Sequence, residues 1–161
     1  MSGAGDEPYS AGEDRPLGGF AGLMGVYAVA VAVGSLVVRR RGGLPERLRT
    51  DDLALVSVAT HKISRLLAKD PVTSPLRAPF TRFAGTTGPA ELKEEVKGIG
   101  AQKAMGELVT CPFCLGQWVA TALVFGLAIA PRATRMVAAT FTVVTAADLL
   151  QFAYSAAEKT E

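Results

Sequence analysis

A chain of 161 residues holds enough material for one domain, but 49% hydrophobic residues and a mean hydropathy of +0.28 are high for a soluble domain of this size. The net charge of +2 conceals a strong segregation, because almost every charged residue lies outside three apolar runs. Such segregation follows membrane topology. The composition therefore predicts a helical membrane protein and argues against a soluble globular fold.

The first apolar run, residues 20–38, follows a tail over residues 1–19 that is rich in Gly, Ser, Pro and acids and has little to bury. We predict a disordered acidic tail and then a transmembrane anchor. Acids precede the run and Arg39, Arg40 and Arg41 follow it, whereas a cleaved signal peptide has a basic start and a shorter apolar core. The pattern predicts a retained anchor with its N-terminus outside.

Small residues recur at four-residue spacing along this anchor. The pairs are Gly18/Gly22, Ala21/Gly25, Ala28/Ala32 and Ala30/Gly34. Such a face lets helix backbones approach closely. Chance pairing in a chain rich in alanine and glycine is the alternative.

Residues 39–112 are predicted to form a basic cytoplasmic loop that contains a helix over residues 53–69. The apolar residues of this helix contribute roughly 2 to 4 kcal/mol towards insertion, whereas Lys62 and Arg65 at mid-membrane cost roughly 5 to 7 kcal/mol. We therefore predict an amphipathic helix that lies in the membrane interface. The alternative is a tilted fourth transmembrane helix, in which Asp148 pairs with the basic residues.

The stretch that follows, up to residue 106, is polar and rich in proline and glycine. We predict an irregular loop there, with one short helical turn over residues 91–97. This assignment leaves no strand in the chain.

The last two apolar runs are predicted to form a transmembrane helical hairpin over residues 113–154, followed by a short tail over residues 155–161. The predicted fold class is an all-α membrane protein with three transmembrane helices plus one amphipathic interfacial helix, and the alternative has four transmembrane helices. Arg132 and Arg135 lie in the turn of the hairpin. They would be outside in the three-span topology and inside in the four-span topology, which favours the alternative.

Two cysteines, Cys111 and Cys114, stand at the start of the second apolar run, separated by proline and phenylalanine. Proline is favoured at the first helical position, so Cys111 is predicted to be the N-cap of a helix. The helix dipole there favours a thiolate, which suits a redox pair or half of a metal site completed by a second chain. A structural role as small hydrophobic side chains is the alternative.

Asp148 is an acid within an apolar run, and an intramembrane carboxylate marks a candidate functional position. The structural alternative is a carboxyl group that reaches the interface and bonds to Gln117, Thr121 or a basic residue. His61 is the single histidine of the chain and has no second ligand nearby in the sequence. It is therefore read as a polar-face residue rather than a metal ligand.

The sequence contains no Gly-rich phosphate loop, HExxH, GxSxG or paired-carboxylate arrangement. A hydrolase or nucleotide enzyme of the soluble type is therefore not expected, and the cofactor is left unassigned. Trp118 and Tyr154 are predicted to anchor the helices at the membrane interface.

Several blocks of sequence occur in a recognisable order. They are Asp51-Asp52-Leu53 with Ala59-Thr60-His61-Lys62-Ile63-Ser64-Arg65-Leu66-Leu67, then Asp70, Thr73 and Leu76-Arg77-Ala78-Pro79-Phe80, then Glu95-Val96-Lys97-Gly98, and finally Glu107-Leu108 and Thr110-Cys111-Pro112-Phe113-Cys114-Leu115-Gly116 with Trp118. Over residues 51–154 this order resembles the bacterial family catalogued as domain of unknown function 1360. The resemblance implies a small membrane protein of Gram-positive bacteria, in a family with some members linked to sporulation and no established activity.

We predict a small multi-pass protein of the bacterial cell membrane that acts as a scaffold or interaction protein rather than as an enzyme. Its expected partners are membrane lipids, anionic ones in particular, and further copies of the chain or other membrane proteins, but not nucleic acid. Lys62, Arg65 and Lys69 are the candidate lipid-contacting residues. The alternative function is a membrane thiol-redox or metal-binding protein that uses Cys111 and Cys114.

Overall fold

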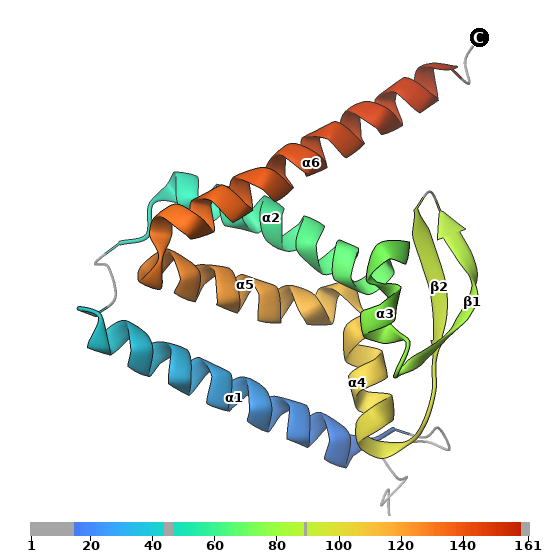
Figure 1. Ribbon diagram of the computed structural model, residues 1–161, viewed down its shortest axis with the longest axis horizontal. Helices are drawn as coiled ribbons and strands as arrows, with labels where there is room; N and C mark the ends of the chain where they lie inside the picture. The colour runs from blue at the N-terminus through green and yellow to red at the C-terminus, as the bar shows by residue number, and fades with distance from the viewer. Residues whose placement is uncertain (1–14, 44–46, 89, 159–161) are drawn as a thin grey trace, which may run out of the picture.

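The computed structural model describes residues 15–43, 47–88 and 90–158, and these form helices apart from one small sheet (Figure 1). Within these ranges the elements, in chain order, are α1 (Leu17–Arg40), α2 (Thr50–Lys69), the 3-10 helix η1 (Pro71–Thr73), α3 (Ser74–Arg77), β1 (Thr81–Gly88), β2 (Glu91–Val96), α4 (Gly100–Thr110), α5 (Pro112–Ile129) and α6 (Pro131–Glu158). The predicted helical fold class is confirmed.

Three helices, α1, α5 and α6, are long and apolar enough to cross a membrane, as the sequence predicts. Only 6% of the apolar window of each is buried inside the protein, so most of their apolar side chains face outward. Parts of the two predicted tails are helical, because α1 begins at Leu17 and α6 continues to Glu158. Residues 1–14 and 159–161 lie outside the described residues.

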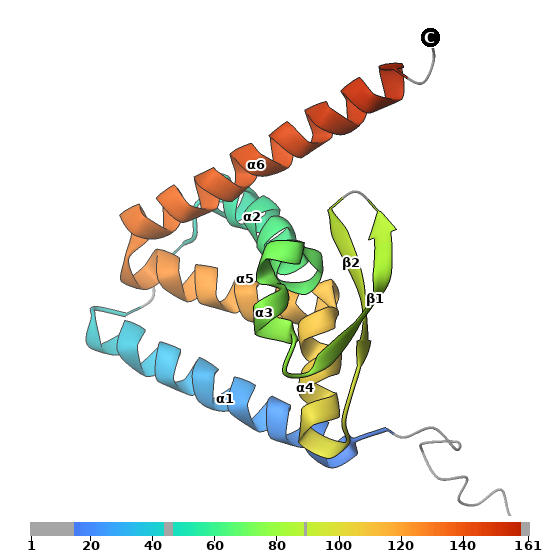
Figure 2. The ribbon, with the colours of Figure 1, turned by 45° about the vertical axis from the view of Figure 1, so that its right-hand side comes forward.

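The helix α2 has the opposite character, because it is less apolar than α1, α5 and α6 and yet is the most enclosed of the four. It lies lengthwise beside α5 and α6 (Figures 1 and 2). A stripe along its whole length is buried, comprising Asp52, Val56, Ala59, Ser64 and Ala68. The helix predicted over residues 53–69 is therefore present, and its buried side packs against protein.

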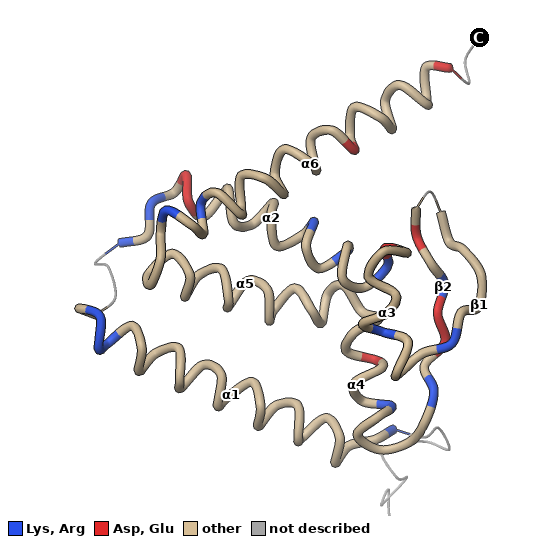
Figure 3. The backbone as a smooth tube through the Cα atoms, viewed as in Figure 1, with Lys and Arg blue, Asp and Glu red and all other residues tan. Residues whose placement is uncertain are grey.

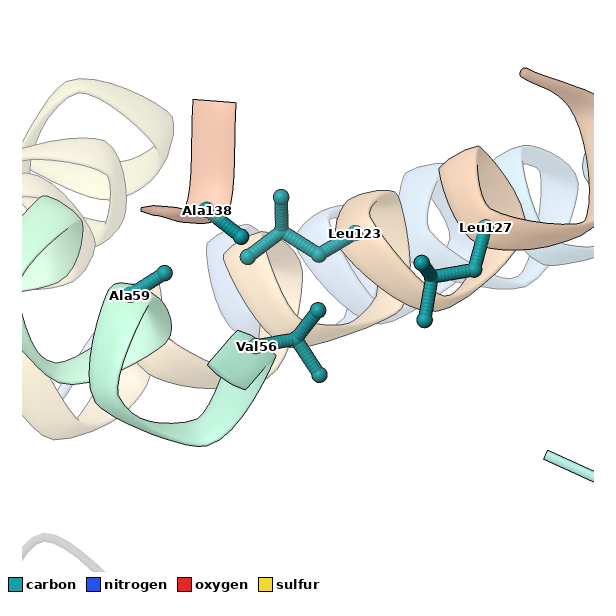
Figure 4. Packing of buried hydrophobic residues seen from close by; sticks show 5 residues of the cluster. All are labelled: Val56, Ala59, Leu123, Leu127 and Ala138. Carbon is teal, nitrogen blue, oxygen red and sulfur yellow. The ribbon is translucent and has the colours of Figure 1, made fainter. Parts of the chain in front are cut away.

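The hydrophobic core is small and lies where α2, α5 and α6 meet. Its buried members are Val56, Ala59, Leu123, Leu127 and Ala138, which come from all three helices (Figure 4). Ala59 and Ala138 are fully buried, and such small side chains let helix backbones come close together. The position of α2 is therefore fixed by contacts with both neighbours.

The segment predicted as an irregular loop instead contains an antiparallel β-hairpin, in which β1 and β2 pair along their length. In β2, Leu92, Glu94 and Val96 are half-buried, and the residues between them, Lys93 and Glu95, are exposed. This alternation has the period of a strand. The predicted helical turn over residues 91–97 was wrong because one inward-facing residue of the alternation, Glu94, is charged and conceals the pattern.

The helix α4 runs across one end of the long helices, beside the hairpin and α3 (Figures 1 and 2). We call α3, β1, β2 and α4 the cap. Gly19 of α1 lies so close to α4 that a Cβ atom there would stand 2.7 Å from Ala104 Cβ. A Cβ atom at Gly34 would likewise stand 2.8 Å from ring carbons of Phe125 in α5. In the predicted small-residue face, Gly34 thus lies at a close helix contact, whereas three other glycines, Gly18, Gly22 and Gly25, face open space.

Candidate functional site

The polar contacts of α2 bring together residues that are far apart in the sequence. Lys62 Nζ donates to Asp148 Oδ2 of α6 at 2.5 Å. The lysine side chain is 21% exposed and the aspartate side chain 38% exposed, so the pair is partly enclosed between the two helices. The ion pair considered for the four-span alternative therefore exists.

A second ion pair joins the other end of α2 to α6. Arg135 donates from Nε and Nη2 to the two carboxylate oxygens of Asp52, both at 2.7 Å. The Asp52 side chain is only 9% exposed, whereas that of Arg135 is 45% exposed. Next to it, Arg49 donates from Nε and Nη2 to the two carboxylate oxygens of the exposed Asp51.

The predicted lipid-contacting residues lie along the cap-side half of α2. Lys62 is engaged by Asp148, and Arg65 pairs with Glu91 at the start of β2. Lys69 is half-buried beside them, at a small cavity of about 80 Å³. Two of these three basic side chains thus have an acidic partner within the protein, although Arg65 is 46% exposed.

Arg77 is the centre of the cap, and its side chain is 1% exposed. It forms an ion pair with Glu94 of β2, whose side chain is 6% exposed. It also donates to the Leu67 carbonyl at 2.8 Å, to Thr73 Oγ1 at 2.7 Å and to the Asp70 carbonyl at 3.0 Å. These bonds satisfy carbonyl groups left free where α2 ends, and they tie that end to the hairpin.

The two cysteines lie where α4 ends and α5 begins. Cys111 is the N-cap of α5, as predicted, and its Sγ accepts the Cys114 backbone N–H at 3.2 Å. Both thiols are free, Cys111 half-buried and Cys114 exposed. Among the described residues no group of three or more His, Cys, Asp or Glu side chains could hold a metal ion, and the exposed His61 belongs to no such group.

A family model described as protein of unknown function (DUF1360) matches residues 55–154. The chain belongs to this family. Sporulation protein YjcA of Bacillus subtilis (strain 168) is similar to it, with 33% identity over 86 residues that cover 52% of this chain and 73% of that relative. No solved structure matches the chain. The resemblance predicted from the sequence blocks is therefore confirmed.

The DUF1360 match contains most of the polar contacts described above. Lys62, Arg77 and their acidic partners lie inside it, whereas Asp52 precedes it and α1 lies wholly outside. Sequence reasoning singled out Lys62 and Asp148 but missed Asp52 with Arg135, and also Arg77 with Glu94. The sequence held one signal for the Asp52–Arg135 pair, because Arg135 lies at the turn of the predicted helical hairpin and has no acid nearby in the sequence. Chemically, these contacts hold helices and the cap in place.

Proposed function

We propose that this DUF1360 protein is a non-enzymatic scaffold of the bacterial membrane, in which α1, α2, α5 and α6 all lie within the bilayer and carry the cap at one end. A single observation carries the proposal: α2 runs alongside α5 over nearly the full length of both helices. The distribution of charge along the chain supports it as well.

The depth of α2 in a bilayer follows from its contacts with α5. At one end Ser64 lies beside Gly116, where a Cβ atom would stand 4.0 Å from Ser64 Oγ. Towards the other end Val56 packs in the same core as Leu127. If α5 crosses the hydrocarbon, α2 therefore shares its depth. This relation favours the four-helix alternative over a helix that lies on the surface.

The charges of α2 are compatible with this position because four of its five charged residues, Asp51, Asp52, Lys62 and Arg65, have an ion-pair partner. The nine residues 53–61 between Asp52 and Lys62 carry no Asp, Glu, Lys or Arg, and as a helix they rise about 13.5 Å. Lys62 is bonded to Asp148, and long basic side chains near helix ends can reach the interface. The cost expected for isolated charges at mid-membrane is thereby reduced.

Charge also favours one orientation. Residues 39–43 and 47–52 lie with residues 130–135 at the end remote from the cap. In the sequence, segments 39–52 and 130–135 together carry seven arginines and three acids. Segment 70–111, which contains the cap, carries five basic and five acidic residues. Basic loops stay in the cytoplasm. We therefore orient the arginine-rich end inside and the cap outside, which removes the conflict that Arg132 and Arg135 pose in the three-span topology.

The scaffold role rests on the exposed surfaces. The outward apolar faces of α1, α5 and α6 need lipid or other membrane helices to cover them. Exposed apolar side chains also lie in the cap, at Leu76, and next to it in the sequence, at Val72, Ile99 and Phe113. The similar Bacillus subtilis protein is named a sporulation protein, so the proposal includes a role in the membranes of sporulating cells.

Reporter fusions after Lys69, Ala133 and Glu161 test the topology. We expect an external signal at Lys69, a cytoplasmic one at Ala133 and an external one at Glu161. The three-span topology requires the opposite at all three positions. A cytoplasmic signal at Lys69 would therefore contradict the proposed position of α2.

The exposed Cys114 provides a check without any fusion. Because it lies on the cap side, a membrane-impermeant maleimide should label it in intact cells, and the variant Cys114→Ser should lose most of that label. Lysed cells serve as the control for total reactivity. Labelling that requires lysis would place the cap inside and contradict the orientation.

A further inference from the structure

A hollow of about 480 Å³ opens where α1 ends, α2 begins and α5 turns into α6. Figure 3 shows basic backbone positions gathered at this end of the long helices. The side chains that line it are Arg41, Arg47, Leu48, Arg49, Asp52, Leu127, Ala128, Pro131 and Arg135. We call it the arginine hollow. Four arginines and one acid among these lining residues give it a surplus of positive charge.

Two of the four arginines have their charge balanced within the protein. Arg49 pairs with Asp51 at 2.8 Å and Arg135 pairs with Asp52 at 2.7 Å. Among the described residues, Arg41 and Arg47 have no ion-pair partner. These two guanidinium groups are therefore available to an anion that enters the hollow.

Two further features suit an anion with an apolar body. The first turns of α2 and α6 both border the hollow, and helix N-termini present free N–H groups and the positive end of the helix dipole. Leu48, Leu127 and Pro131 form an apolar part of its wall. Guanidinium groups bind phosphate in a forked geometry, and an apolar wall next to them fits a hydrocarbon chain.

We propose that the arginine hollow binds the phosphate group of an anionic phospholipid, with Arg41 and Arg47 as its principal donors and the acyl chains along α5 and α6. The site differs from the predicted one at Lys62, Arg65 and Lys69, two of which are paired internally. The lipid assignment rests on the proposed function, which orients the hollow towards the inner leaflet of the membrane. Binding by purified protein is nevertheless measured independently of topology.

In the experiment, the purified full chain in a zwitterionic detergent is titrated with phosphatidylglycerol or with phosphatidylcholine of the same chain length. The number of bound lipid molecules is measured by native mass spectrometry. The test variant is R41Q/R47Q. The control is R40Q/R132Q, which removes the same charge at the same end from two exposed arginines that do not line the hollow. Both variants keep the Asp51 and Asp52 ion pairs, so their melting temperatures should match that of the wild type.

We expect selective binding of phosphatidylglycerol, weakened roughly 25-fold in R41Q/R47Q, since each arginine beside a phosphate contributes about fivefold. The control should change the affinity by less than about twofold, since neither of its arginines lines the hollow. Equal losses in both variants, or no loss in R41Q/R47Q, would overturn the site. Complete displacement of the lipid by millimolar inorganic phosphate would also overturn the proposal, because the hollow would then serve free phosphate.

Discussion

The two ends of the helical bundle use charge in different ways. At the cap end the basic side chains Lys62, Arg65 and Arg77 each have an acidic partner, and Arg77 is almost completely buried with its own. At the arginine-rich end the arginines outnumber the acids, and Arg41 and Arg47 are without an ion-pair partner among the described residues. Ion pairs within the protein hold the cap end together, whereas the arginine-rich end has guanidinium groups without an internal partner.

This difference between the two ends shows that a basic residue in the sequence does not by itself mark a binding surface. A guanidinium group that is bonded inside the protein must lose those bonds before it can bind a lipid, whereas an unpaired one at a hollow need not. The number of basic side chains in excess of their acidic partners therefore indicates where an anionic lipid can bind. Substitutions at the two ends should reflect this, with larger losses of stability at the cap.

The largest loss is expected for Arg77→Ala. It removes four side-chain contacts and leaves Glu94 buried without its partner, which costs about 3 to 5 kcal/mol in the free energy of unfolding. Thermal melting in detergent, followed by circular dichroism, measures this. The control Arg82→Ala removes an exposed arginine of β1 and should change the stability by less than about 0.5 kcal/mol.

A second variant separates charge from packing at the same position. In R77M/E94M both charges are replaced by apolar side chains, and part of the stability lost in Arg77→Ala should return. A loss below about 1 kcal/mol in Arg77→Ala would contradict the view that the cap depends on this buried ion pair.

The next largest effect is expected at the contact between α1 and α4 of the cap. Gly19→Ala places a Cβ atom 2.7 Å from Ala104 Cβ and 2.9 Å from the Gly100 carbonyl, so the helices must separate at a cost of about 1 to 3 kcal/mol. Gly22→Ala is the matched control, because it meets open space and should be neutral or stabilising by up to about 1 kcal/mol. Equal stabilities of the two variants in thermal melts would show that α1 does not pack on α4 in this way.

Features that depend on neighbouring residues could be predicted from the sequence. The apolar run over residues 20–38 lies inside α1, and Cys111 is the N-cap of α5, since hydropathy and capping are local properties. A helix over residues 53–69 was also predicted correctly. The family was recognisable from blocks that include Arg77 and Cys111.

Features that depend on distant residues could not be predicted in the same way. Asp52 and Arg135 are separated by 83 positions, and Lys62 and Asp148 by 86. The cost assigned to Lys62 was that of an unpaired group, because its partner on α6 is remote in the sequence and was considered only in the four-helix alternative. The hairpin was missed for a related reason, since the inward-facing Glu94 pairs with Arg77, 17 positions earlier in the chain.

The smallest effect is expected at the arginine-rich end, for Asp52→Asn. The Arg135 side chain is 45% exposed beside Asp52, so water can solvate it once the partner is lost, and the melting temperature should fall by roughly 2 to 4 °C. Asp51→Asn, at an exposed pair, is the control and should change little; a loss at Asp52 as large as that at Arg77 would show that the two ends do not differ as described.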